Sequence, residues 1–109
     1  MPSAAEPDFD PLAALRRRYV DHLATLRRDL GAAMKKRSPS VRGAAVGTVA
    51  HSVAGTSGSL GFDDISRAAF ELEAAARRHQ EGGATLELLR LALAAMLDAI
   101  DEVVLNAPA

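Results

Sequence analysis

Apolar residues recur at intervals of three and four along four stretches of the chain, and each stretch is bounded by residues that start or stop helices. A helix with 3.6 residues per turn places such positions on one face. No stretch shows the alternation of apolar and polar residues that is typical of a strand. The pattern predicts four amphipathic helices, from Pro11 to about Lys36, from Pro39 to Gly61, from about Asp63 to before Gly82, and from about Thr85 to before Pro108.

The predicted helix ends rest on local capping signals. Asp10-Pro11 and Ser38-Pro39 each combine a capping side chain with a proline, which is well tolerated in the first helical turn. Gly61 and Gly82-Gly83 suit the positions that follow a helix, where the backbone turns into the left-handed region. The predicted helices are therefore separate, with only a few residues between them.

Short connections favour antiparallel neighbours, so we expect an all-α fold, an antiparallel up-down-up-down four-helix bundle. Residues 10–109 form this bundle in our interpretation, and residues 1–9, which lack periodicity, form a flexible N-terminal tail. The expected core positions of the first and last helices are Leu12, Leu15, Tyr19, Leu23, Leu26, Leu30, Ala33, Leu86, Leu89, Leu93, Met96, Leu97, Ile100, Val103 and Val104. Those of the middle helices are Val46, Val49, Val53, Leu60, Phe62, Ile65, Ala69, Leu72 and Ala76.

One histidine, His51, lies on an unusually bare face of the second helix. At 100° per residue, small residues fall within about 40° of it, and the valines fall on the opposite side, so the imidazole should point outward. The glycines of this helix should together cost about 2–4 kcal/mol relative to alanine. Such a cost suggests a functional purpose, the close docking of a partner's reactive group. The expected docking surface consists of Ala44, Gly47, Thr48, Ala54, Gly55 and Gly58, with Arg42, Lys35 and Lys36 as candidates for its charged rim. A flexible glycine-rich loop with an incidental histidine is the alternative interpretation.

Composition narrows the function classes. The chain has 109 residues, 25% of them charged, a net charge of -1 and no cysteine, which fits one small domain without disulfides or a thiol nucleophile. The absence of a long apolar run predicts a soluble, cytoplasmic protein that does not enter the membrane. The basic runs Arg16–Arg18 and Lys35–Arg37 are interpreted as solvated helix faces. With few aromatic residues to stack on bases, nucleic-acid binding is disfavoured.

Other chemistry finds little support. His22 and His79 are interpreted as structural or solvated, and no helical zinc-site spacing, nucleophile elbow or phosphate-binding loop is present. We therefore expect no metal and no cofactor. Paired acidic residues on the last two helices, Glu71 with Glu73 and Asp98 with Asp101, fit solvated faces better than a catalytic pair.

His51, Gly55 and Gly61 match the pattern H-x-x-K-G-x-x-x-x-x-G, which is followed here by Ile65, Leu72 and the acidic Glu73. This combination resembles the histidine-containing phosphotransfer (HPt) domains of bacterial phosphorelays, over most of the chain. One position departs from the pattern, because Ala54 stands where the family often has a lysine near the phosphoryl group.

The resemblance implies that His51 accepts a phosphoryl group on the ring nitrogen farther from the backbone. It also implies a carrier without turnover of its own, which moves phosphate between receiver-domain aspartates while the partner supplies the divalent metal. The implied partners are receiver domains of response regulators and hybrid histidine kinases, and the implied state is a monomer. Two alternatives remain at this stage: an adaptor bundle that binds such partners without being phosphorylated, and a basic nucleic-acid binder.

Overall fold

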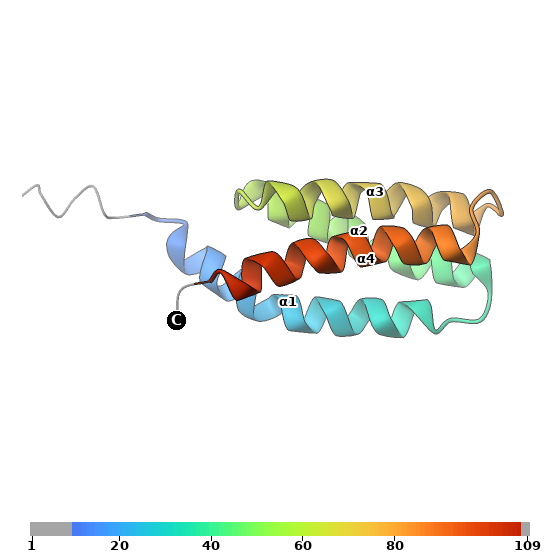
Figure 1. Ribbon diagram of the computed structural model, residues 1–109, viewed down its shortest axis with the longest axis horizontal. Coiled ribbons are helices and arrows are strands. Elements are labelled where there is room, and N and C mark those ends of the chain that lie inside the picture. Colours follow the sequence, from blue (N-terminus) through green and yellow to red (C-terminus); the bar gives the residue numbers. More distant parts are fainter. Residues whose placement is uncertain (1–9, 108–109) are drawn as a thin grey trace, which may run out of the picture.

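The computed structural model describes residues 10–107, and within them the chain forms four helices and no strand. The helices are α1 (Ala13–Met34), α2 (Pro39–Ser59), α3 (Asp63–Gln80) and α4 (Leu86–Leu105). They run alternately up and down along one axis and pack side by side, with both ends of the described chain at the same end of the bundle (Figure 1). The predicted all-α four-helix bundle is confirmed, whereas the expected tail, residues 1–9, lies outside the described residues.

The helix ends follow the capping signals with one exception. The Ser38 hydroxyl accepts from the Val41 N–H at the start of α2, and Gly61 and Gly82 adopt positive φ angles of 86° and 83° after α2 and α3. Asp10 instead caps a turn that precedes α1, since its carboxylate accepts from the Leu12 N–H at 2.9 Å and regular helix begins only at Ala13. Proline and glycine thus terminate the helices largely where the sequence places them.

The core is made of aliphatic side chains and alanine. Most of the predicted stripe positions are buried, but Leu15 and Val104 are nearly half exposed because the ends of α1 and α4 extend past the other two helices (Figure 1). The fully buried large side chains come from all four helices: Leu23, Leu30, Val46, Val53, Ile65, Leu72, Leu89 and Met96. No helix within residues 10–107 is long and apolar enough to cross a membrane.

Polar contacts attach α1 to the C-terminal part of α2. The Tyr19 hydroxyl lies 2.8 Å from the buried Ser57 hydroxyl, and the Arg16 Nε donates to the Leu60 carbonyl at 2.8 Å. The Tyr19 ring also stacks on Phe62, and burial raises the pKa of its phenol. Arg16 is therefore not part of a solvated basic face, as we expected from the sequence, but a brace between α1 and the turn after α2.

The helices α2 and α3 make the most extensive contact in the bundle, and glycine makes it possible. A Cβ on Gly43 would lie 2.6 Å from the Ala76 carbonyl oxygen, and a Cβ on Gly58 would lie 3.1 Å from the Ser66 hydroxyl. The cost of the α2 glycines suggested a functional purpose for all of them, and this expectation is wrong for Gly43, where close helix packing requires the missing side chain. Gly55 differs, because an added Cβ there would meet nothing within 4 Å.

The buried His79 links the two connections at one end of the bundle, the one between α1 and α2 and the one between α3 and α4. Its Nδ1 lies 2.9 Å from the Ala84 carbonyl and its Nε2 lies 2.9 Å from Arg42 Nη1. Arg42 also donates to the carbonyls of Lys36 and Arg37 in the connection between α1 and α2. His79 is thus structural, as predicted, and it links two connections that are distant in sequence.

The two kinds of glycine in α2 give opposite predictions for alanine substitution. We expect Gly43→Ala to lower the free energy of unfolding by about 1–3 kcal/mol, because α3 must move away from the new methyl group. Gly55→Ala should raise the free energy of unfolding by about 0.5–1 kcal/mol through helix propensity alone. Urea denaturation followed by circular dichroism measures both. Equal effects of the two substitutions would show that helix packing does not depend on Gly43.

Candidate functional site

His51 lies near the middle of α2 with 78% of its side chain exposed. The prediction that its imidazole points out of the bundle is confirmed. It stands between two surface grooves, one between α2 and α3 with a volume of about 450 Å³, the other between α1 and α2 with a volume of about 670 Å³. A partner can therefore reach the ring from outside the bundle.

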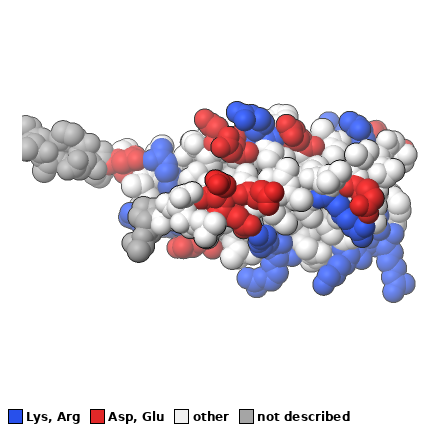
Figure 2. Space-filling view, in the orientation of Figure 1, with Lys and Arg blue, Asp and Glu red and all other residues white. Residues whose placement is uncertain are grey.

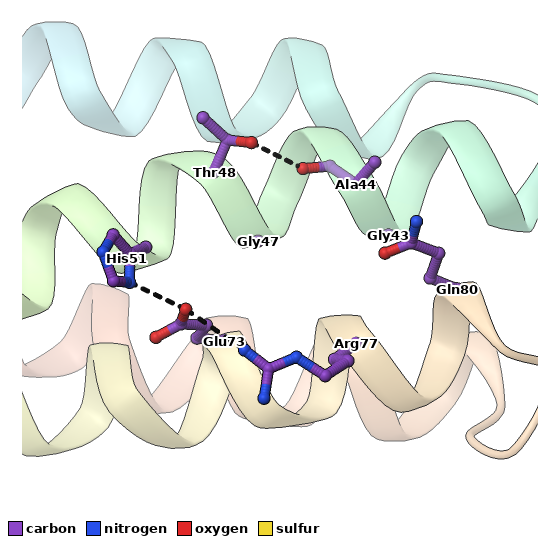
Figure 3. A pocket seen from close by; sticks show the side chains of 8 residues that line it. All are labelled: Gly43, Ala44, Gly47, Thr48, His51, Glu73, Arg77 and Gln80. Atoms are coloured by element: carbon purple, nitrogen blue, oxygen red, sulfur yellow. Dashed lines mark hydrogen bonds and ion pairs between the residues drawn. The ribbon is translucent and has the colours of Figure 1, made fainter.

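The carboxylate of Glu73, on α3, holds one side of the imidazole. His51 Nδ1 lies 2.8 Å from Glu73 Oε2, and the Arg77 guanidinium lies 3.5 Å from the same oxygen (Figure 3). Only 16% of the Glu73 side chain is exposed. The expectation that Glu73 belongs to a solvated face is therefore wrong, although the resemblance included this residue as the acidic position that follows the motif.

The contact with Glu73 determines which nitrogen of the His51 ring carries the hydrogen. An ionised carboxylate can only accept a hydrogen bond, so His51 Nδ1 carries the hydrogen and donates it. In the neutral imidazole the other nitrogen, Nε2, then keeps its lone pair. In Figure 3 Nε2 lies on the side of the ring away from Glu73, so the unprotonated nitrogen is the one that an incoming molecule can reach.

The close packing of α2 on α3 sets the position of Glu73. Ser66, two helical turns before Glu73 on α3, donates from its hydroxyl to the Ala54 carbonyl of α2 at 2.8 Å. On the other side of Glu73, Ala76 approaches the backbone of α2 at Gly43 and Gly47. Because small residues border Glu73 on both sides of the helix contact, the two helices lie close enough for the carboxylate to reach His51. In the sequence, the close approach of α3 to α2 was indicated by the small residues that recur at helical spacing on α3.

The expected docking residues separate into accessible and buried positions. Ala54 is only 6% exposed, and its contact with α3 excludes it from the accessible surface. The error arose because Ala54 lies on the flank of α2 that α3 covers, a direction that the helical projection of α2 alone cannot give. Gly47 is half-buried in the floor of the groove between α2 and α3. The exposed members are Ala44, Thr48, Gly55 and Gly58.

The expected charged rim changes as well. Arg42 is bound to His79 and to two backbone carbonyls at the end of the bundle, so it is not available near the His51 ring. Lys35 and Lys36 lie in the connection at that same end. The arginines that line the grooves beside His51 are Arg77 on α3 and Arg18 on α1.

Charge is distributed unevenly over the bundle. Lys and Arg side chains gather along α1 and at the end where α1 meets α2, whereas acidic and basic side chains alternate over α3 and α4 (Figure 2). An ion pair joins α1 to α4, with Arg27 lying 2.6 Å from Asp101. Within the described part of the chain, no group of three or more acidic, histidine or cysteine side chains is placed to hold a metal ion.

Comparison with known proteins adds the family. The family model of the Hpt domain matches residues 13–103, a span that begins at the first residue of α1 and ends within the last turns of α4. Neither the curated proteins nor the solved structures gave a match. Hpt domains act in histidine phosphotransfer within phosphorelays and interact with receiver domains of response regulators. The matched span covers α1 to α3 and nearly all of α4, and it includes the exposed His51, so the chain belongs to the Hpt domain family.

Proposed function

We propose that His51 is the phosphoacceptor and that the protein carries a phosphoryl group from one receiver-domain aspartate to another. The observation that carries this proposal is the hydrogen bond between His51 Nδ1 and Glu73, which leaves Nε2 as the free nucleophile on an exposed ring. Each other histidine in the chain fits the role less well. His79 is buried with both ring nitrogens engaged, and His22 has no carboxylate at its ring within the described contacts.

The transfer step requires no general base from this protein. The lone pair of His51 Nε2 forms a bond to phosphorus while the bond from phosphorus to the aspartate oxygen breaks. The receiver carboxylate leaves with that electron pair, and the hydrogen on Nδ1 stays in place. The phosphorylated ring carries a positive charge, and the Glu73 carboxylate at 2.8 Å stabilises it. Transfer onward is the reverse of this step with a second receiver.

Ala54 changes the stability of the carried group more than the transfer itself. The partner receiver supplies a divalent metal that neutralises the phosphoryl oxygens during the in-line displacement. That charge is present only while the partner is bound. A lysine at position 54 would act on the phosphohistidine between the two encounters, so its absence does not remove the nucleophile.

The resulting role is that of a carrier without turnover of its own. Receiver domains of response regulators and of hybrid histidine kinases are its proposed partners, and a monomer in the cytoplasm is its proposed state. The accessible docking residues Ala44, Thr48, Gly55 and Gly58 surround His51 with little side-chain bulk. A partner's phosphorylated loop can therefore approach the ring closely.

Phosphotransfer from a panel of phosphorylated receivers tests the proposal directly. We expect acid-labile, alkali-stable label on the wild type and none on His51→Gln, since glutamine lacks a nucleophilic nitrogen. The exposed His22→Gln serves as the control and should be labelled like the wild type. Receiver binding without label on the wild type would instead indicate an adaptor, and label that persists in His51→Gln would place the acceptor elsewhere.

The role of Glu73 gives a second prediction. Glu73→Gln keeps an oxygen that can accept from His51 Nδ1 but removes the negative charge that favours the phosphorylated ring. A loss of about 1 kcal/mol, the usual gain of a charge-assisted bond over a neutral one, should move the equilibrium about fivefold toward the phosphorylated receiver. The label on each protein at equilibrium gives this ratio. Glu71→Gln, an exposed neighbour on α3, is the matched control, and equal ratios for both variants would contradict the assignment.

A further inference from the structure

An exposed aromatic side chain lies on α3, one helical turn before Glu73. Phe70 is 67% exposed, although it lies within a well-formed helix and not at a frayed end. Exposure of a large aromatic ring to water is unfavourable, and such rings commonly anchor protein interfaces. By contrast, Tyr19 and Phe62, the other aromatic residues of the described chain, stack on each other inside the bundle.

The contacts of α3 determine the side on which Phe70 lies. Ser66, four residues earlier, donates to the Ala54 carbonyl of α2, and Glu73, three residues later, bonds to His51. Residues separated by three and four positions share a helix face. Phe70 therefore lies between two direct contacts with α2, on the outer edge of that face, level with the segment that carries His51.

On the other flank of α2, toward α1, the surface beside His51 is open. A Cβ added at Gly55 would meet no atom within 4 Å, and the groove beyond it toward α1 includes the partly exposed Leu15. An apolar ring on α3, bare backbone on α2 and an apolar side chain on α1 thus lie across the bundle near His51. This arrangement suits a partner with an apolar face more than a polar ligand.

A protein interface of ordinary size, if it includes His51, is large enough to include Phe70 as well. A specific complex buries about 800 Å² on each partner, which corresponds to a patch of about 15 Å radius around its centre. Phe70 is one helical turn from Glu73, which itself touches the His51 ring. Nε2 lies on the side of the ring away from Glu73, so a receiver domain that brings an aspartyl phosphate to it covers the surface around the ring. A patch of about 15 Å radius at that position reaches the outer edge of α3 as well as α2.

We infer that Phe70 is an anchor of the receiver-docking surface, contributed by α3, and that it binds an apolar patch on the receiver beside the phosphorylated aspartate. This inference rests on the proposed function, because the receiver is the molecule that His51 requires. It extends the docking surface beyond the second helix, where the sequence had placed all of it. Phe70 acts on affinity and not on the chemical step, since it touches neither the ring nitrogen nor the phosphoryl group.

The test compares two truncations that are matched in exposure. Phe70→Ala removes the proposed anchor, and Leu91→Ala removes a side chain of 66% exposure on α4. Initial rates of phosphotransfer are measured against receiver concentration, with the receiver that labels the wild type fastest in the panel. Phe70→Ala should raise the receiver concentration for half-maximal rate roughly tenfold and leave the saturating rate close to the wild type. Leu91→Ala should change neither quantity.

Phosphoramidate, a small phosphoryl donor that needs no docking surface, separates this inference from the proposed function. It should label the wild type and Phe70→Ala at the same rate. Absence of label from both donors would overturn the proposed function itself. Label from phosphoramidate alone, or equal receiver dependence for Phe70→Ala and the wild type, would overturn the docking inference and leave His51 as an acceptor.

Self-association is the competing use of an exposed aromatic ring, and light scattering decides it. We expect the wild type and Phe70→Ala to have the same molar mass at the concentrations of the transfer assay. A wild-type dimer that Phe70→Ala converts to a monomer would assign the ring to contact between two copies of the chain. That result would overturn the receiver-docking inference.

Discussion

The close approach of α2 and α3 is the constraint on which the site depends. It requires the absence of a side chain at Gly43, where a methyl group would collide with the Ala76 carbonyl. It is strengthened by the hydrogen bond from Ser66 to the Ala54 carbonyl. At a wider helix separation Glu73 would not reach the His51 ring, and the imidazole would rotate freely in solvent. Helix packing here has a chemical consequence, because it decides which ring nitrogen carries the hydrogen.

This arrangement divides the work between helices. The nucleophile is on α2, while α3 supplies the carboxylate that orients it and, one helical turn from that carboxylate, an exposed aromatic ring. The first helix braces the C-terminal part of α2 through Tyr19 and Arg16. A reactive side chain needs a fixed backbone and a free ring edge, and contacts on both flanks of α2 provide the first without covering the second.

The helices and their order were accessible from the sequence because their signals are local. Ser38 with Pro39 marks the start of α2, and Gly61 ends it with a positive φ, as a residue without a side chain allows. The periodicity of the apolar positions likewise placed His51 on the outer face. The resemblance to HPt domains identified His51 and Glu73 together, although the residues alone suggested a solvated position for the glutamate.

The sequence by itself therefore determined four helices, their antiparallel order and an exposed histidine, since each follows from spacing along one segment. Only the tertiary structure decided which flank of α2 is covered by α3. That choice buried Ala54, gave Gly43 a packing role and placed Glu73 next to His51, with the exposed Phe70 one helical turn from Glu73 on α3. The physical reason is that a helical projection gives the direction of a side chain about its own axis. It carries no information about the rotation and depth of the neighbouring helix, which depend on contacts between residues distant in sequence.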